Sequence, residues 1–78
     1  MEQKTRRKLA LSLSMSSSPH DINIVLAILS LTQETLAKRL EVTQAAISYA
    51  INNDPLMNKL RIRIIDYLNL LQFKKEVA

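Results

Sequence analysis

Apolar residues recur along this chain at helical spacing, in blocks separated by short polar stretches. In the block from about Met57 to Phe73, four apolar residues follow one another at intervals of four, four and three residues, which places them on one face of a helix. The block from Pro19 to Ser30 is apolar on most sides, so we expect a helix that is central in the core or covered by the N-terminal segment or a second subunit. The face of the final helix consists of Leu60, Ile64, Leu68 and Leu71, widened by Ile65 and Tyr67.

Hydroxyl side chains mark the starts of the predicted helices, because they can cap free backbone amides. Ser18 precedes Pro19, which suits the first helical position, and Asp21 complements the positive end of the helix dipole. Thr32 predicts a second helix that runs through Leu40.

A third helix is predicted after a turn of three residues, Glu41-Val42-Thr43. Thr43 is its cap, and apolar residues at helical spacing extend it from Gln44 to about Asn52, where Asn53, Asp54 and Pro55 end it. Two short capped helices joined by such a turn form a helix-turn-helix arrangement, although any bundle of three or four helices contains similar pairs.

The stretch from Leu60 to Ile64 has a second interpretation, because apolar and basic residues alternate there as in a strand. A strand at this position needs a turn and a returning partner, and the chain has no glycine for a hairpin. We therefore predict that the stretch is helical.

The composition favours helices and limits the chemistry of the chain. Of 78 residues, 47% are hydrophobic but only 4% are aromatic, and glycine is absent, so the core must consist mainly of Leu, Ile, Val and Ala. The absence of cysteine excludes disulfides and thiolate metal sites, and the net charge of +4 is compatible with a polyanionic partner. We expect a single all-α domain, a compact bundle of four to five helices.

Residues 1–17 form a basic and then Ser-rich segment, interpreted as an N-terminal arm or extra helix before a helical domain over residues 18–78. Serines interrupt its short apolar stretch, so it is a poor signal peptide. The apolar run from Ile22 to Leu31 is about half of the ~20 residues that a membrane span requires, so no membrane partner is expected. The arm could enter a DNA groove, keep the chain in solution or pack on the core; its basic residues are Lys4, Arg6, Arg7 and Lys8.

A family resemblance rests on residues 31–52, which read LTQETLAKRLEVTQAAISYAIN. This stretch resembles the lambda-repressor and Cro-like family of helix-turn-helix DNA-binding proteins, and the likeness covers roughly residues 20–72. Glu41 stands where the family commonly has glycine, so it must adopt a left-handed backbone at a cost of roughly 1 kcal/mol. The packing positions of the family pattern are Leu36, Ala37, Leu40, Val42 and Ile47.

The resemblance implies that the second helix of the pair enters the major groove of double-stranded DNA. Gln44 could then bond an adenine, and Ala45 could meet a thymine methyl group. Tyr49 would contact the DNA backbone or pack on a neighbouring helix, and Gln33 would bond a phosphate or be an ordinary solvated residue. The expected DNA-binding residues are Gln33, Lys38, Arg39, Thr43, Gln44, Ala45, Ser48, Tyr49 and Asn52.

No Lys or Arg lies on the expected recognition helix, so attraction to phosphates must come from elsewhere. Each basic residue nearby has an equally simple interpretation as part of a solvated face. The candidates are Lys38, Arg39, Lys59, Arg61, Arg63 and the basic arm.

The same resemblance implies a homodimer on a palindromic operator with half-sites about one turn apart, because one small domain alone binds weakly. The first and final helices are the candidate interfaces. The family would make this a Cro-like repressor of a bacteriophage or bacterium, acting in the cytoplasm of a bacterial cell and associated with the nucleoid.

Two other interpretations stay open. The chain could be a protein-interaction module, an antitoxin or antirepressor whose apolar helices bind another protein, although the polar outer face of the third helix favours DNA. Residues 46–68 also resemble the headpiece of lac-repressor-type regulators, which begin directly with the helix pair and carry a large sensor domain. An enzyme is not expected, and no catalytic residue, cofactor or metal is assigned, because His20 is the single histidine and no glycine-rich phosphate loop exists.

Overall fold

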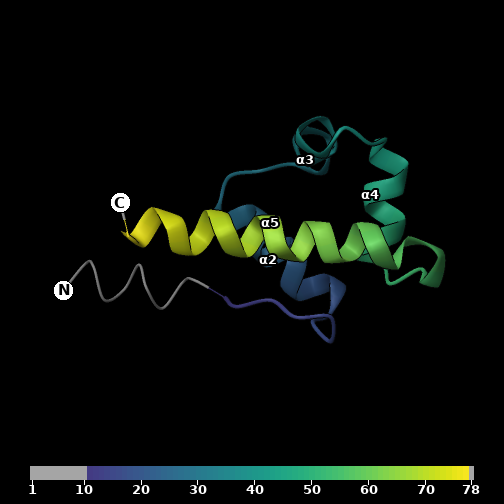
Figure 1. Cartoon of the computed structure of the whole chain (residues 1–78). Coiled ribbons are helices and arrows are strands. Elements are labelled where there is room, and N and C mark those ends of the chain that lie inside the picture. The colour runs from purple at the N-terminus through teal and green to yellow at the C-terminus, as the bar shows by residue number, and fades with distance from the viewer. Residues whose placement is uncertain (1–10, 78) are drawn as a thin grey trace.

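A computed structural model describes residues 11–77 of the chain, with side chains through Phe73. These residues fold into α-helices (Figure 1). No strand occurs in this part of the chain, so the all-α prediction is confirmed. The elements are α2 (Pro19–Ile28), α3 (Gln33–Leu40), α4 (Gln44–Ile51), the 3-10 turn η1 (Pro55–Met57) and α5 (Asn58–Val77).

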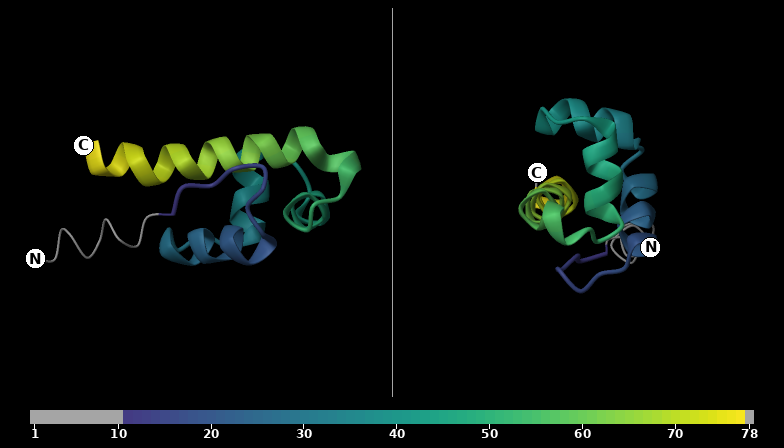
Figure 2. Two further views of the ribbon diagram at one scale, coloured as in Figure 1. Left: turned by 90° about the horizontal axis from the view of Figure 1, so that it is seen from below. Right: turned by 90° about the vertical axis from the view of Figure 1, so that its right-hand side faces the viewer.

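The longest helix, α5, runs along one side of the molecule and the other helices pack against it or against each other (Figure 1). Seen along α5 in the right panel of Figure 2, the α3–α4 pair and α2 lie together on one side of it. Helix α4 crosses α5 near the N-terminal half of α5, and α3 lies across the far end of α4. Among residues 11–77, no other helix covers the opposite side of α5 (Figure 2, right).

Every helix contributes to one hydrophobic core. The family-pattern residues Leu36, Ala37, Leu40 and Ile47 are buried, and Val42 packs against them half-buried, as predicted. The face predicted for the final helix is also largely confirmed, with Leu71 and Tyr67 at its half-buried edge. The remaining buried apolar residues are Leu13, Ile22, Val25, Leu26, Ala50, Ile51, Leu60, Ile64, Ile65 and Leu68.

The three predicted hydroxyl caps are present at the starts of α2, α3 and α4. Ser18 Oγ accepts a hydrogen bond from the Asp21 amide at 3.1 Å. Thr32 Oγ1 accepts one from the Thr35 amide at 3.0 Å, and Thr43 Oγ1 accepts one from the Ala46 amide at 3.1 Å. Each cap satisfies an amide that has no partner within its helix.

The same three helices end in the same way, on a residue with a left-handed backbone. Ser30, Glu41 and Asn53 have φ values of 56°, 61° and 67°. At Glu41 the Val42 amide donates to Ala37 O at 3.0 Å and the Glu41 amide donates to Lys38 O at 3.3 Å, which is the Schellman pattern. Equivalent bonds occur at Ser30 and Asn53. The left-handed backbone expected at Glu41 is therefore confirmed, and it recurs at two further positions.

Two predicted boundaries differ from those observed. The first helix ends at Ile28 and not at Ser30, because the Schellman bonds reverse the chain there. The last helix starts after a 3-10 turn and continues to Val77, past Phe73, because the polar residues that follow are good helix formers. The stretch from Leu60 to Ile64 lies within α5, so the strand alternative is excluded.

Residues 11–17 form no helix and lie along α5, with Leu13 in the core. The side-chain amide of Asn69 accepts from the Leu13 N–H at 2.9 Å and donates to the Leu13 carbonyl at 2.9 Å. One turn later, Gln72 makes the same two bonds to Leu11 at 2.8 Å. We call Asn69 and Gln72 the amide clamp. The basic residues of the predicted arm, within residues 1–10, lie outside the described residues.

Candidate nucleic-acid interface

Helix α4 has one face in the core and one face in solvent. Ile47 and Ala50 are fully buried and Ile51 is 1% exposed. At about 100° per residue, the predicted contact residues from Gln44 to Asn52 fall within an arc of about 140° on the opposite side. This outer face consists of Gln44, Ala45, Ser48, Tyr49 and Asn52, of which only Ser48 is half-buried.

The outer face of α4 carries hydrogen-bonding groups that have little structural use. Tyr49 is 56% exposed, so its alternative placement against a neighbouring helix is not observed. Asn52 Nδ2 donates to the Ser48 carbonyl at 2.9 Å, which holds the amide over the last turn of α4. The Gln44 side chain lies at the first turn, next to the cap residue Thr43. The face is therefore polar, uncharged and available to a partner.

Two arginines of α5 hold the C-terminal ends of α3 and α4. Arg61 Nη1 donates to the carbonyls of Ala50 and Ile51 at 2.9 Å each, and Nη2 donates to the Ser17 carbonyl. Arg63 Nη2 donates to the carbonyl of Leu40, the last residue of α3, at 2.9 Å. Positive charge at a helix C-terminus is favourable because free carbonyls gather there. The orientation of the helix pair on α5 thus depends on these two side chains.

The position of Arg61 corrects one expectation. Arg61 was a candidate for attracting phosphates, but it is 1% exposed and both of its terminal nitrogens donate to main-chain carbonyls, while its buried Nε has no hydrogen-bond partner. The signal was present in the sequence, since Arg61, Ile65, Leu68 and Gln72 follow the spacing of four, three and four that defines one helix face. This spacing places both buried polar residues of α5, Arg61 and Gln72, on the core-facing side, and neither burial was predicted.

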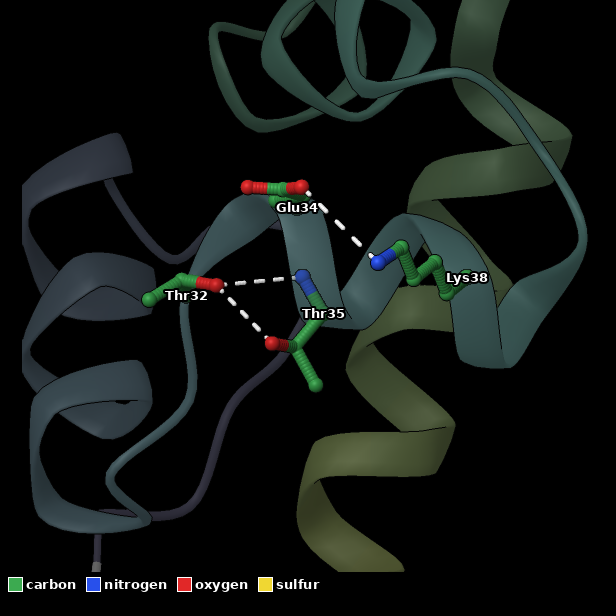
Figure 3. Close-up of polar contacts among 4 residues, drawn as sticks. All are labelled: Thr32, Glu34, Thr35 and Lys38. Carbon is green, nitrogen blue, oxygen red and sulfur yellow. Dashed lines mark hydrogen bonds and ion pairs between the residues drawn. The ribbon is translucent and has the colours of Figure 1, made fainter.

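The first turn of α3 is held by Thr32, whose hydroxyl also donates to Thr35 Oγ1 at 3.0 Å (Figure 3). On another side of the helix, Lys38 Nζ lies 3.8 Å from Glu34 Oε2, with side chains 78% and 67% exposed. An ion pair this exposed is weak and leaves Lys38 free to exchange partners. Gln33 is half-buried, and its Nε2 lies 3.5 Å from Asn23 Oδ1 of α2.

Arg39 points to the other side of α3. Its Nη1 donates to the Tyr67 hydroxyl of α5 at 3.0 Å, while the residue as a whole stays exposed. The structure thus brings the α4 residues together on one face, places Gln33 and Lys38 on α3, the other helix of the pair, and directs Arg39 toward α5. Thr43 serves as the α4 cap.

No group of three His, Cys, Asp or Glu side chains in the described part of the chain could hold a metal ion. Among the same residues, no helix is both long and apolar enough to cross a membrane.

Comparison with known proteins yields no relative: no family model, no curated protein and no solved structure matches this chain. The geometry of the helix pair and the residues of its outer face are therefore the basis on which function is inferred.

Proposed function

We propose that this protein is a sequence-specific DNA-binding regulator in which α3 and α4 act as a helix-turn-helix and α4 reads the major groove. One observation carries the proposal: the exposed face of α4 bears the side chains suited to base edges, while its other face is fully buried. An eight-residue helix is about 12 Å long, which suits a groove about 12 Å wide.

The outer face also matches the chemistry of base recognition. A glutamine such as Gln44 bonds adenine through two atoms, and the methyl group of Ala45 suits a thymine methyl. Ser48 and Asn52 supply shorter hydrogen-bonding groups for base edges or phosphates, and Tyr49 supplies a hydroxyl for the backbone.

Phosphate contacts would come from the surroundings of α4. Lys38 is exposed on α3, and Gln33 and the first amides of α3 form a helix N-terminus of the type that attracts phosphate. Glu34 in the same turn repels phosphate, and Lys38 offsets that charge. Affinity through phosphates should therefore be moderate, and base contacts should carry a large share of the discrimination.

The regulator would act as a homodimer on a two-fold operator, in the manner of the Cro-like repressors that the sequence resembles, in the cytoplasm of a bacterial cell. A second candidate, a protein-interaction module of the antitoxin or antirepressor class, is favoured by one observation. Leu56 is 89% exposed and Leu70 is 56% exposed, which suits an apolar partner surface.

Selection from a randomised pool of duplex DNA tests the proposal. The expected product is a two-fold motif with half-sites about one turn apart, bound tightly in the presence of unrelated competitor. Gln44→Ala should weaken binding to the selected site by roughly 10-fold to 100-fold and relax the preference at one base pair.

Ser12→Ala is the matched control, because Ser12 is exposed on the segment along α5, away from α4. It should bind as the wild type does. If no motif is enriched and all duplexes bind equally weakly, the DNA-reading proposal fails and the protein-interaction candidate takes its place.

A further inference from the structure

Residues 11–17, which we call the strap, are attached to α5 at both ends. At the first end the amide clamp holds the backbone of Leu11 and Leu13 through hydrogen bonds of 2.8 to 2.9 Å. At the second end the Ser17 carbonyl accepts a hydrogen bond from Arg61 Nη2. Between these ends the strap runs alongside α5 and then turns into α2 (Figure 2, left).

The second attachment of the strap is shared with α4. The guanidinium that bonds Ser17 also donates, through Nη1, to the carbonyls of Ala50 and Ile51 at 2.9 Å each, and these are the last two residues of α4. The corresponding end of α3 is bonded by a different side chain, that of Arg63. Arg61 alone therefore connects the end of the strap with the C-terminal end of α4.

Burial of Arg61 makes its bonds to the strap and to α4 depend on each other. The residue is 1% exposed, its Nε has no hydrogen-bond partner, and its hydrogen bonds go to three carbonyls and not to a carboxylate. A buried cation is costly unless its donors are satisfied. If the strap leaves, Nη2 loses its acceptor and must be hydrated. Water that reaches the guanidinium then competes with the carbonyls of α4 for the remaining donors.

We infer that the strap positions α4: the docked strap keeps Arg61 on the carbonyls of α4, and release of the strap loosens the C-terminal end of that helix. Asn69 and Gln72 are then positioning residues for α4. They lie eight and eleven residues after Arg61, which is about 12 Å and about 16 Å along α5, so they act on α4 through the strap. The inference deepens the proposed function and rests on it, because it names what holds the reading face in place.

The charges of this region separate positioning from direct DNA contact. The strap and the amide clamp contain no charged side chain, so opening the clamp removes no cation from them. Lys4, Arg6, Arg7 and Lys8 precede the strap in the sequence, and a contact of theirs with phosphate would appear in the salt dependence of binding. Positioning predicts a lower affinity with an unchanged salt dependence.

Hydrogen exchange in the full-length protein without DNA tests the inference by itself. The double variant Asn69→Ala/Gln72→Ala opens the clamp, and in it the amides of Asn53 and Asp54 should exchange roughly 3-fold to 10-fold faster. These amides close the C-terminal end of α4, and the Asn53 amide shares its acceptor, the Ala50 carbonyl, with Arg61. The Leu13 amide shows in the same experiment whether the strap has been released.

The end of α3 supplies the control within the molecule. In the clamp variant the Val42 amide, which bonds the Ala37 carbonyl, should keep its exchange rate because Arg63 holds that end. Arg63→Met should give the reverse pattern, with faster exchange at Val42 and no change at Asn53. Ser12→Ala is the matched control on the strap, since it changes an exposed side chain between the two clamped residues and should alter none of these amides.

Binding of the clamp variant to the selected duplex measures the consequence for DNA recognition. Affinity should fall roughly 3-fold to 10-fold, because only the molecules with α4 in place are competent to bind. The slope of log K against log salt should stay unchanged.

Three results would overturn the inference. They are an unchanged Asn53 amide when that of Leu13 exchanges faster, equal acceleration at Asn53 and Val42, and a changed salt slope in the clamp variant. The first two need no DNA, so they are separate from the test of function. If the exchange pattern is as expected but no duplex is preferred, the proposed function fails alone. If specific binding is found and the clamp variant binds as the wild type does, this inference fails alone.

Discussion

Three residues carry the backbone reversals for which most proteins use glycine. Ser30, Glu41 and Asn53 have positive φ at the ends of α2, α3 and α4, and the chain contains no glycine. A side chain in this conformation costs roughly 1–2 kcal/mol, and less for asparagine, which tolerates it best. The turn between α3 and α4 is therefore held in place by its neighbours at some cost in stability.

Replacing Glu41 by glycine should stabilise the protein. We expect the free energy of unfolding to rise by about 0.5–1 kcal/mol, because relief of the left-handed strain exceeds the added flexibility of the unfolded chain. Urea denaturation measures the change. Asn53→Gly is the control and should give a smaller gain; a loss of stability in Glu41→Gly would contradict this account.

Arg61 should be the most sensitive polar residue of the fold. Arg61→Met retains much of the side-chain volume but leaves the carbonyls of Ile51 and Ser17 without their side-chain donor and leaves Ala50 O with the Asn53 amide alone, and we expect a loss of about 2–4 kcal/mol. Arg63→Met removes a single bond from a more exposed side chain and should cost about 1 kcal/mol. Equal effects of the two substitutions in chemical denaturation would refute the distinction.

At the scale of elements, the sequence predicted what is local. Ser18, Thr32 and Thr43 were predicted as caps because each directly precedes a helical pattern and its hydroxyl can bond a backbone amide within the first turn. All three caps are observed. The roles of Arg61 and the amide clamp were not predicted, because their partners lie 10 to 61 residues away. Helical spacing marks such residues as buried but does not say which carbonyl they meet.

The amide clamp can be tested through the segment that it holds. Asn69→Ala and Gln72→Ala remove the partners of the Leu13 and Leu11 amides, so we expect faster hydrogen exchange at those two positions. Stability should fall by about 1 kcal/mol for each substitution. Asn58→Ala, at an exposed position at the start of α5, is the control. Unchanged exchange at Leu13 in Asn69→Ala would argue against the clamp.

At the scale of the whole molecule, the distribution of charge determines which residues could contact a polyanion. The chain has a net charge of +4, yet α4 has no charged side chain, and Arg61 is buried. Any cation that contacts phosphate must therefore lie outside α4. If α4 reads DNA as we propose, attraction to phosphate and recognition of bases belong to different residues, so the two should respond differently to substitution.

Lys38→Ala should lower the affinity for every duplex by a similar factor and reduce the slope of log K against log salt by about 0.9. Glu34→Gln should raise affinity, because it removes a negative charge that pairs with Lys38. Fluorescence anisotropy across a salt series measures both. A Lys38→Ala variant that changes the base preference but keeps the slope would show that Lys38 contacts bases and not phosphates.

The amide clamp also affects the order of folding during synthesis, because residues 11–17 cannot dock until α5 has been made. Leu13 and Leu11 are made before their partners Asn69 and Gln72, which follow 56 and 61 residues later. Closing so long a loop is slow compared with forming local helices, so α2, α3 and α4 can form first and the segment docks last. Until α5 is made, the side chain of Leu13 has no core to enter and is exposed to chaperones and proteases. Truncation after α4 should therefore produce a chain that the cell degrades.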